Sequence, residues 1–162
     1  MIDKEYYTKR ISETGPVGLV ALNFELTLDF LLKARKMYLD ESKDIDQARH
    51  LVTRAREGIE NLIQSLDFDV PLASDFYEVY KYAYGLLCDV QQSRDGKKVV
   101  RALDEAAEIM ESFLKAWKEL AEKTVEEPLP LEDGPKVYAG LTYGKDGKAK
   151  EYVENIAGGY KA

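Results

Sequence analysis

The sequence predicts an all-α fold, an antiparallel up-down four-helix bundle with an irregular C-terminal tail. Apolar residues recur at spacings of three and four along four segments between residues 16 and 123, as they do in amphipathic helices. No run of alternating apolar and polar residues indicates a strand. Helix-breaking residues are sparse before residue 124 and frequent after it: Gly134, Gly140, Gly144, Gly147, Gly158, Gly159, Pro128, Pro130 and Pro135. We therefore expect a helical domain over residues 1–123, with an irregular lead-in at residues 1–15, and a Gly/Pro-rich tail over residues 124–162.

The first two predicted helices begin at a proline and at a capping aspartate. Residues 16–39 start with Pro16, whose fixed φ suits the first turn of a helix. Apolar residues in this segment cover more than one stripe, so the helix either lies centrally in the bundle or keeps a second apolar face for another purpose. Residues 44–66 form the second helix, with Asp44 as its N-cap. Its apolar stripe comprises Ile45, Ala48, Leu51, Val52, Ala55, Ile59, Leu62, Ile63 and Leu66.

The last two predicted helices complete the bundle. The third begins after Pro71, with Ser74 or Asp75 near its start, and reaches about residue 93. Its stripe comprises Phe76, Tyr80, Ala83, Leu87 and Val90. The fourth starts after the turn at residues 95–96, and its stripe comprises Val99, Val100, Leu103, Ala106, Ala107, Met110, Phe113, Leu114, Trp117, Leu120 and Ala121. Because the connections are short, neighbouring helices must run antiparallel.

The composition indicates a soluble, acidic protein of the cytoplasm. A formal net charge of −7 argues against binding to nucleic acid, because an acidic surface is repelled by phosphates. No apolar run approaches the roughly 18 residues that a membrane-spanning helix needs, so membrane insertion is not expected. Residues 1–7 lack the apolar stretch of a secretory signal. The single cysteine, Cys88, cannot form an internal disulfide and suits a reducing compartment.

Residue types that support catalysis or metal binding are scarce. A ferritin-like di-metal site needs two Glu-x-x-His units, but His50 is the single histidine and Gln47 stands at the glutamate position. The segment at residues 140–145 is superficially similar to a phosphate-binding loop. Its glycine spacing is one residue short, however, and Asp146 stands where Ser or Thr is required. We therefore expect no enzyme, no catalytic residue, no metal and no cofactor.

Tyrosines are unusually frequent and unevenly placed. Four of the eleven crowd the third predicted helix, namely Tyr77, Tyr80, Tyr82 and Tyr84. At about 100° per residue Tyr77 and Tyr84 share a face, Tyr80 belongs to the core stripe and Tyr82 projects elsewhere. Tyrosine rings suit a binding interface that is exposed to water when no partner is bound. The alternative is that these rings only pack at the edges of the bundle. The first and third helices together carry more apolar surface than one small core requires, which favours a binding function.

Several short motifs match a known family. Residues 79–87 read Val-Tyr-Lys-Tyr-Ala-Tyr-Gly-Leu-Leu and fit the pattern Leu-Tyr-x-Tyr-x-Tyr-x-x-Leu of its third helix. Further matches are Gly15-Pro16, Phe24, Phe30-Leu31 and Ala34, then Ser65-Leu66-Asp67 with Leu72, and Ala116-Trp117-Lys118. On these residues the chain resembles the flagellar secretion chaperones of the FliS type over residues 5–121. The family prefers Ser where this chain has Gly15 and Tyr where it has Phe24, and further departures in residue type are Asn23, Leu26 and Gln91.

The resemblance implies a non-enzymatic cytoplasmic chaperone of flagellum assembly and protein secretion. Such a chaperone binds the C-terminal segment of flagellin, prevents premature polymerisation and aids delivery to the flagellar export apparatus. Flagellin is therefore the expected partner, with the flagellar export gate as a further one, and exposed apolar helix faces would allow a homodimer. Two alternatives stay open. One is a helical-bundle interaction or regulatory module for another secreted partner, and the other is an unrecognised metal or small-molecule enzyme.

A client-binding groove is expected where large apolar residues of different helices meet. Its candidate residues are Phe24, Leu28, Leu31, Tyr77, Tyr84 and Trp117. In the lead-in, Tyr6, Tyr7 and Ile11 are expected to cover part of this groove. The competing assignment is core packing, because Trp117 falls within the apolar stripe of the fourth helix and Phe24 and Leu28 suit either place.

The tail is too apolar for a simple solvated linker. Its glycines are interspersed with Val137, Tyr138, Leu141, Tyr143, Tyr152, Val153 and Ile156. One hypothesis is that part of the tail packs on the chain's own bundle, or on a neighbour's, as a placeholder for the client. The alternative is that the tail is disordered.

Overall fold

The computed structural model describes residues 3–40 and 44–123 and has five helices there. They are α1 (Lys4–Glu13), α2 (Pro16–Leu39), α3 (Ile45–Gln64), α4 (Ala73–Gln92) and α5 (Gly96–Lys123). No strand occurs among the described residues, and the all-α class is confirmed. The tail at residues 124–162, and with it the hypothesis that the tail packs on the bundle, lies outside the described residues.

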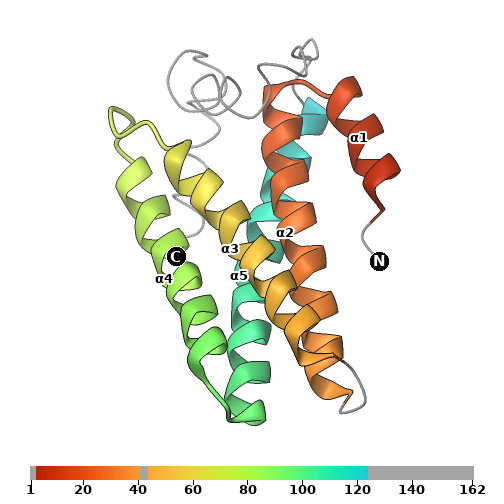
Figure 1. Ribbon diagram of the computed structural model, residues 1–162. Coiled ribbons are helices and arrows are strands. Elements are labelled where there is room, and N and C mark those ends of the chain that lie inside the picture. Colours follow the sequence, from red (N-terminus) through yellow and green to blue (C-terminus); the bar gives the residue numbers. More distant parts are fainter. Residues whose placement is uncertain (1–2, 41–43, 124–162) are drawn as a thin grey trace.

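The four long helices, α2 to α5, form what we call the four-helix body. Figure 1 shows them running alternately down and up, each beside the next in sequence. Both α2 and α4 pack against α3 and α5, so the ring of four helices closes between α5 and α2. The short helix α1 lies outside this ring and folds back along the N-terminal half of α2 (Figure 1).

The helices α3 and α5 begin where the sequence predicts them, and a local aspartate cap holds each start. Asp44 caps α3, where its carboxylate accepts hydrogen bonds from the backbone amides of Asp46 at 2.9 Å and Gln47 at 3.3 Å. Asp95 acts in the same way at α5 and accepts from the amide of Lys97 at 3.0 Å. These caps satisfy backbone donors that a helix cannot pair within itself.

The prediction for the N-terminal segment is wrong. Residues 1–15 are expected to be irregular, yet Lys4–Glu13 form α1. Asp3 is the N-cap, and its carboxylate accepts from the amide of Tyr6 at 3.0 Å. Tyr7 is only 6% exposed and Ile11, one turn later, packs against the same core. An isolated ten-residue helix is marginal in water, so this helix depends on a contact that the local sequence does not reveal.

Aromatic rings from three helices form the centre of the core. Phe24 of α2 stacks on Phe113 of α5 with ring centroids 5.3 Å apart. Phe76 and Tyr80 of α4 contact the same Phe113 ring at 5.4 and 5.2 Å. Trp117 of α5, one turn further along, is also fully buried. Because one ring contacts partners on two other helices, the positions of α2, α4 and α5 depend on each other.

The helices α2 and α3 approach each other closely at Gly58. Asn23 of α2 donates from its side-chain amide to the Gly58 carbonyl at 3.3 Å, and the Thr27 hydroxyl donates to the Asn23 side chain at 3.4 Å. A Cβ atom placed on Gly58 would lie 2.2 Å from the Thr27 hydroxyl oxygen. Since Thr27 is 1% exposed, its side chain has little room to move away. A side chain at Gly58 would therefore push α2 and α3 apart.

Gly58→Ala is expected to destabilise the protein, with Gly85→Ala as the matched control. A Cβ at Gly85 of α4 meets nothing within 4 Å. Both replacements gain up to about 1 kcal/mol of helix propensity, whereas the crowding at Gly58 costs about 1–3 kcal/mol. In urea unfolding followed by circular dichroism, Gly85→Ala should equal or exceed the wild type in stability and Gly58→Ala should fall below Gly85→Ala. Equal stability of the two variants would contradict the close approach.

Candidate functional site

The helix α2 buries apolar residues on two sides. Phe24 and Leu31 point into the four-helix body and are fully buried. Leu22 lies two residues before Phe24, about 200° around the helix, and so points away from the body. It nevertheless has only 4% of its surface exposed. Leu19, Leu22 and Leu26 follow each other at spacings of three and four, and we call them the outward stripe of α2.

The helix α1 covers this outward stripe. The Tyr7 hydroxyl donates to Asp29 at 2.5 Å, and the Tyr6 hydroxyl donates to Glu25 at 2.9 Å. Both carboxylates belong to α2, so the two bonds place α1 alongside residues 25–29. Tyr7 and Leu22 belong to one buried cluster, and Ile11 and Leu26 pack against it. The second apolar face of α2 is thus covered by the chain's own N-terminal helix.

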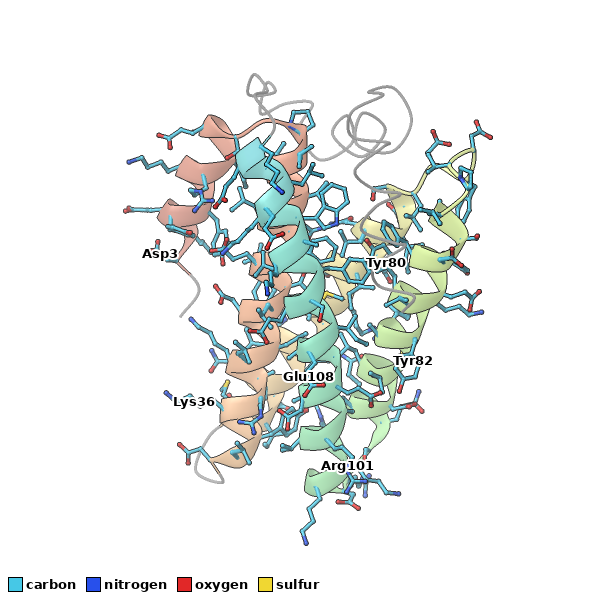
Figure 2. The ribbon with its side chains drawn as sticks, turned by 180° about the vertical axis from the view of Figure 1, so that it is seen from behind. Asp3, Lys36, Tyr80, Tyr82, Arg101 and Glu108 are labelled. Carbon is cyan, nitrogen blue, oxygen red and sulfur yellow. The ribbon has the colours of Figure 1, made fainter. Side chains whose placement is uncertain are left out.

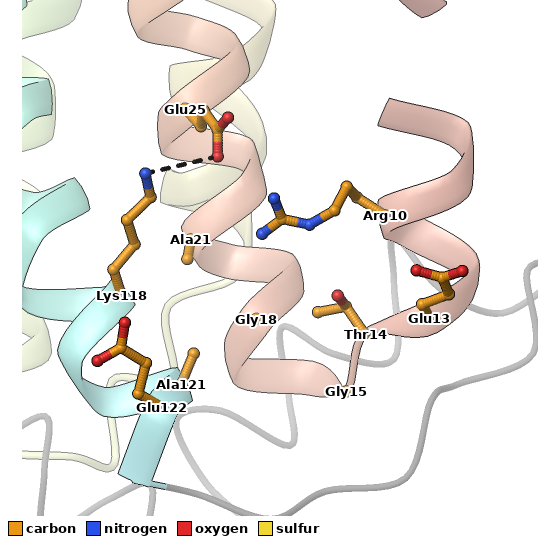
Figure 3. Close-up of a pocket in the computed structure, with 10 residues that line it drawn as sticks. All are labelled: Arg10, Glu13, Thr14, Gly15, Gly18, Ala21, Glu25, Lys118, Ala121 and Glu122. Atoms are coloured by element: carbon orange, nitrogen blue, oxygen red, sulfur yellow. Dashed lines mark ion pairs between the residues drawn. The ribbon is translucent and has the colours of Figure 1, made fainter. Parts of the chain in front are cut away.

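A hollow remains where α1 meets the start of α2. Its volume is about 500 Å³, and Gly15, Gly18 and Ala21 provide small residues along its α2 wall. Figure 3 shows Arg10 extending from α1 towards α2, while Lys118 of α5 pairs with Glu25 at 3.9 Å. Charged groups from α1, α2 and α5 therefore line the hollow, and α1 does not pack tightly against α2 along its whole length.

Neutral tyrosine hydroxyls hold α1 in place. Burial, and then the hydrogen bond to Asp29, raise the pKa of Tyr7 above its ordinary range. The hydrogen bond to Glu25 raises the pKa of Tyr6, whose hydroxyl also accepts from Arg10 at 2.7 Å. Because the folded pKa exceeds the unfolded one, this stabilisation is complete below about pH 10 and is lost as the pH rises through the folded value.

Three of the predicted groove residues lie in the core. Phe24, Leu31 and Trp117 are each 0% exposed. Phe24 and Trp117 follow the competing assignment to core packing, because their helices turn these rings towards the centre of the body. In this conformation none of the three side chains can contact a partner directly, and a binding role for them stays a prediction.

The other three predicted groove residues are half-buried but do not meet. Leu28 lies on the α2 edge towards α5, one heptad before Arg35, which pairs with Asp104 of α5. Tyr77 of α4 contacts the ring of Phe68 in the α3–α4 connection at 5.8 Å. Tyr84 lies on the face of α4 towards α3, so these residues occupy edges of the body rather than one groove.

Tyr84 is tied into a polar network between α3 and α4. The Arg56 guanidinium donates to the Tyr84 hydroxyl at 2.8 Å, and that hydroxyl donates to Glu60 at 2.8 Å. The guanidinium also lies over the Tyr84 ring, 4.9 Å from its centroid. Arg56 reaches Gln91, one heptad after Tyr84, as well. The ring therefore joins two helices, and part of its surface stays accessible.

The lead-in residues come together with α2 as a covering element. Tyr7 and Ile11 face the body, whereas Tyr6 is 40% exposed at the rim. The outward stripe they cover was not singled out from the sequence. The signal that could have found it is the spacing of Leu19, Leu22 and Leu26, which forms a separate stripe from the core residues of the same helix.

Neither a metal-binding cluster nor a helix suited to cross a membrane occurs among the described residues. Within residues 3–40 and 44–123 no group of His, Cys, Asp and Glu side chains could hold a metal ion. No helix in the same part of the chain is long and apolar enough to cross a membrane. His50 is exposed on α3, and Cys88 on α4 is half-buried as a free thiol.

The fold and this surface define a class of protein, a helical body with an apolar helix face that accepts a second amphipathic helix. Comparison with protein families identifies the family within this class. The family model of the flagellar protein FliS matches residues 2–124, so the chain belongs to the FliS family. Membership implies a flagellar chaperone role in flagellum assembly. A comparison with curated proteins found no match.

Tyr7→Phe is expected to loosen α1. It removes the hydroxyl that donates to Asp29, and a hydrogen bond to a charged group contributes about 1.5–3 kcal/mol. Hydrogen exchange at pH 7 should show amides of residues 4–13 exchanging about tenfold faster or more, with the four-helix body unchanged. Tyr82→Phe is the control, because that hydroxyl also donates to a carboxylate, Glu105, but far from α1. Unchanged exchange in Tyr7→Phe would contradict the assignment.

The same variant tests the pH dependence of the Tyr7 contact. In urea unfolding, the wild type should be more stable than Tyr7→Phe by a constant amount from neutral pH up to about pH 9. Above about pH 10 the difference should shrink, because the unfolded wild type ionises Tyr7 while the folded protein resists ionisation. A difference that stays constant through pH 11 would show that Tyr7 is not held neutral in the fold.

Proposed function

We propose that the protein is a cytoplasmic export chaperone that binds the C-terminal segment of flagellin and prevents its premature polymerisation. Membership of the FliS family supports a flagellar chaperone role. The observation that carries the proposal is the outward stripe of α2, where Leu22 faces away from the four-helix body and is still only 4% exposed. A surface that already accepts one amphipathic helix is suited to accept another.

In this proposal α1 holds the place of the client. A ten-residue helix is too short to be stable alone, so α1 is folded only while it occupies the α2 face. A flagellin segment with an apolar helix face would displace α1 and bury the same stripe. The apparent affinity for the client is then the intrinsic affinity multiplied by the fraction of molecules in which α1 has left the α2 face. Such competition favours release of the client at the export apparatus.

Other parts of the body extend the proposed contact. Leu28, Tyr77 and Tyr84 are half-buried at edges of the body, where an extended client segment could pass over them. The core residues Phe24, Leu31 and Trp117 act behind this surface by keeping α2 in place within an antiparallel up-down bundle. Delivery to the export apparatus would add the flagellar export gate as a partner. Exposed Leu32 and Leu39 on α2 are candidates for a homodimer contact.

The proposal predicts that loosening α1 raises client affinity. Tyr7→Ala removes both the buried ring and the hydrogen bond to Asp29, so α1 competes less well. Isothermal titration with a synthetic peptide of a flagellin C-terminal segment should show affinity about three- to tenfold higher for Tyr7→Ala than for the wild type. A lower affinity would mean that α1 contacts the client instead of competing with it.

A second substitution in the Tyr7→Ala background tests the α2 face itself. Leu22→Ser removes a side chain that the bound client should bury, which is worth about 1.5–3 kcal/mol and thus about tenfold or more in affinity. Leu39→Ser is the matched control, because Leu39 is 55% exposed at the other end of α2. Equal binding by both variants would contradict the location of the site. No binding by any correctly folded variant would favour a different secreted partner.

A further inference from the structure

A second hollow, with an apolar floor and an acidic rim, lies between α4 and α5, away from the outward stripe of α2. It is a shallow, open depression of about 540 Å³, and Val79, Tyr82 and Ile109 provide its apolar lining. Tyr82 is 52% exposed, an unusual position for a large ring, and its hydroxyl donates to Glu105 across the groove. Figure 2 shows Tyr82 on α4 and Glu108 on the neighbouring α5. We call this feature the α4–α5 groove.

The charges of the α4–α5 groove all have one sign. Glu78, Glu105 and Glu108 are the charged residues that line it, and Ser112 completes its polar rim. A ligand that fits this surface must bring apolar side chains for the lining and cations for the carboxylates. The distribution therefore selects a basic, aromatic segment and disfavours an acidic one.

Such a segment exists in the chain's own tail. Residues 136–150 read Lys-Val-Tyr-Ala-Gly-Leu-Thr-Tyr-Gly-Lys-Asp-Gly-Lys-Ala-Lys. They contain four lysines and one aspartate, a net charge of 4 − 1 = +3, in a protein whose total is −7. The apolar residues of the same segment are Val137, Tyr138, Leu141 and Tyr143. The preceding residues 124–135 carry only acidic charges, and four of the five lysines of the tail lie in residues 136–150, the fifth being Lys161.

The length of chain outside the described residues allows this segment to reach the groove. The helix α5 ends at Lys123, and Ile109 lies 14 residues earlier, about 21 Å along the helix at 1.5 Å per residue. Residues 124–135 provide 12 residues, which can span up to about 40 Å. The tail can therefore return along its own molecule. A tether of this length holds its segment at roughly millimolar effective concentration, which favours a contact within one chain over one between chains.

We propose that residues 136–150 dock in the α4–α5 groove of the same chain, with lysines facing Glu78, Glu105 and Glu108 and the apolar residues covering Val79, Tyr82 and Ile109. The groove lies on other helices than the outward stripe of α2, so the proposal goes beyond the chaperone function and does not depend on it. It gives the tail a defined place and removes an exposed aromatic surface from solvent.

Disulfide trapping in the full chain tests the contact directly. In a Cys88→Ala background, Ser112→Cys at the groove is combined with Thr142→Cys in the tail. The control combines Thr142→Cys with Asn61→Cys, an exposed position on α3, the helix diagonal to α5. Under mild oxidation at low micromolar protein, the groove pair should form an intramolecular disulfide in at least fivefold higher yield than the control pair. Equal yields would overturn the proposal, and so would disulfide-linked dimers as the main product of the groove pair.

Charge substitution in the trapped pair tests the chemistry of the contact. Glu108→Lys reverses one carboxylate of the groove. Glu111→Lys makes the same change on the α5 edge towards α2, because Glu111 lies one heptad from Asp104 and from Lys118, which both pair with α2. Glu108→Lys should lower the yield of the intramolecular disulfide severalfold, and Glu111→Lys should leave it unchanged. An equal effect of both would show only a response to net charge and would overturn the proposal. Neither experiment contains flagellin, so failure here leaves the proposed chaperone function to its own test.

Discussion

The organisation of this protein depends on the apolar surface of α2, which one interface cannot bury. Phe24 and Leu31 are satisfied by the aromatic cluster of the four-helix body, but Leu19, Leu22 and Leu26 lie on another side of the same helix. Exposed to water, this stripe would favour aggregation. The helix α1 covers this stripe, and α1 depends on the stripe in turn because an isolated ten-residue helix is marginal in water. The second apolar face thus explains both the existence of α1 and the choice of the candidate site.

Much of the body could be predicted from local sequence. The caps Asp44 and Asp95 fix helix starts through bonds to the next two or three amides, and these bonds need no tertiary contact. The buried stripe of α4 also follows from helical spacing, and Tyr80 lies in it as expected. What local patterns do not contain is the angle between helices. Helical spacing alone places Tyr77 and Tyr84 on one face of α4. Their neighbours on α3 and in the α3–α4 connection depend on the angle between helices, so they could not be named.

The candidate site was predicted only in part, for related reasons. The residue type of an apolar side chain does not show whether it packs in the core or lines a binding groove. Phe24 and Trp117 therefore suited a groove as well as the centre of the body. The helix α1 was missed because its stability comes from docking rather than from its own sequence. Its hydroxyl contacts to Glu25 and Asp29 join residues about twenty positions apart, and spacing rules within one helix do not reach that far.

The connection between α1 and α2 consists of Thr14 and Gly15 alone, both in extended conformation. A two-residue connection allows α1 to rotate away from α2 but keeps it tethered. The rings of Tyr6 and Tyr7 therefore stay close to the leucines that α1 covers, at most tens of ångströms away. Motions of such short joints take nanoseconds to microseconds. In the proposed function, an incoming client helix would therefore replace α1 stepwise, one turn entering as another leaves. On that route the leucines of α2 would pass from contact with α1 to contact with the client while exposing little of their surface to water.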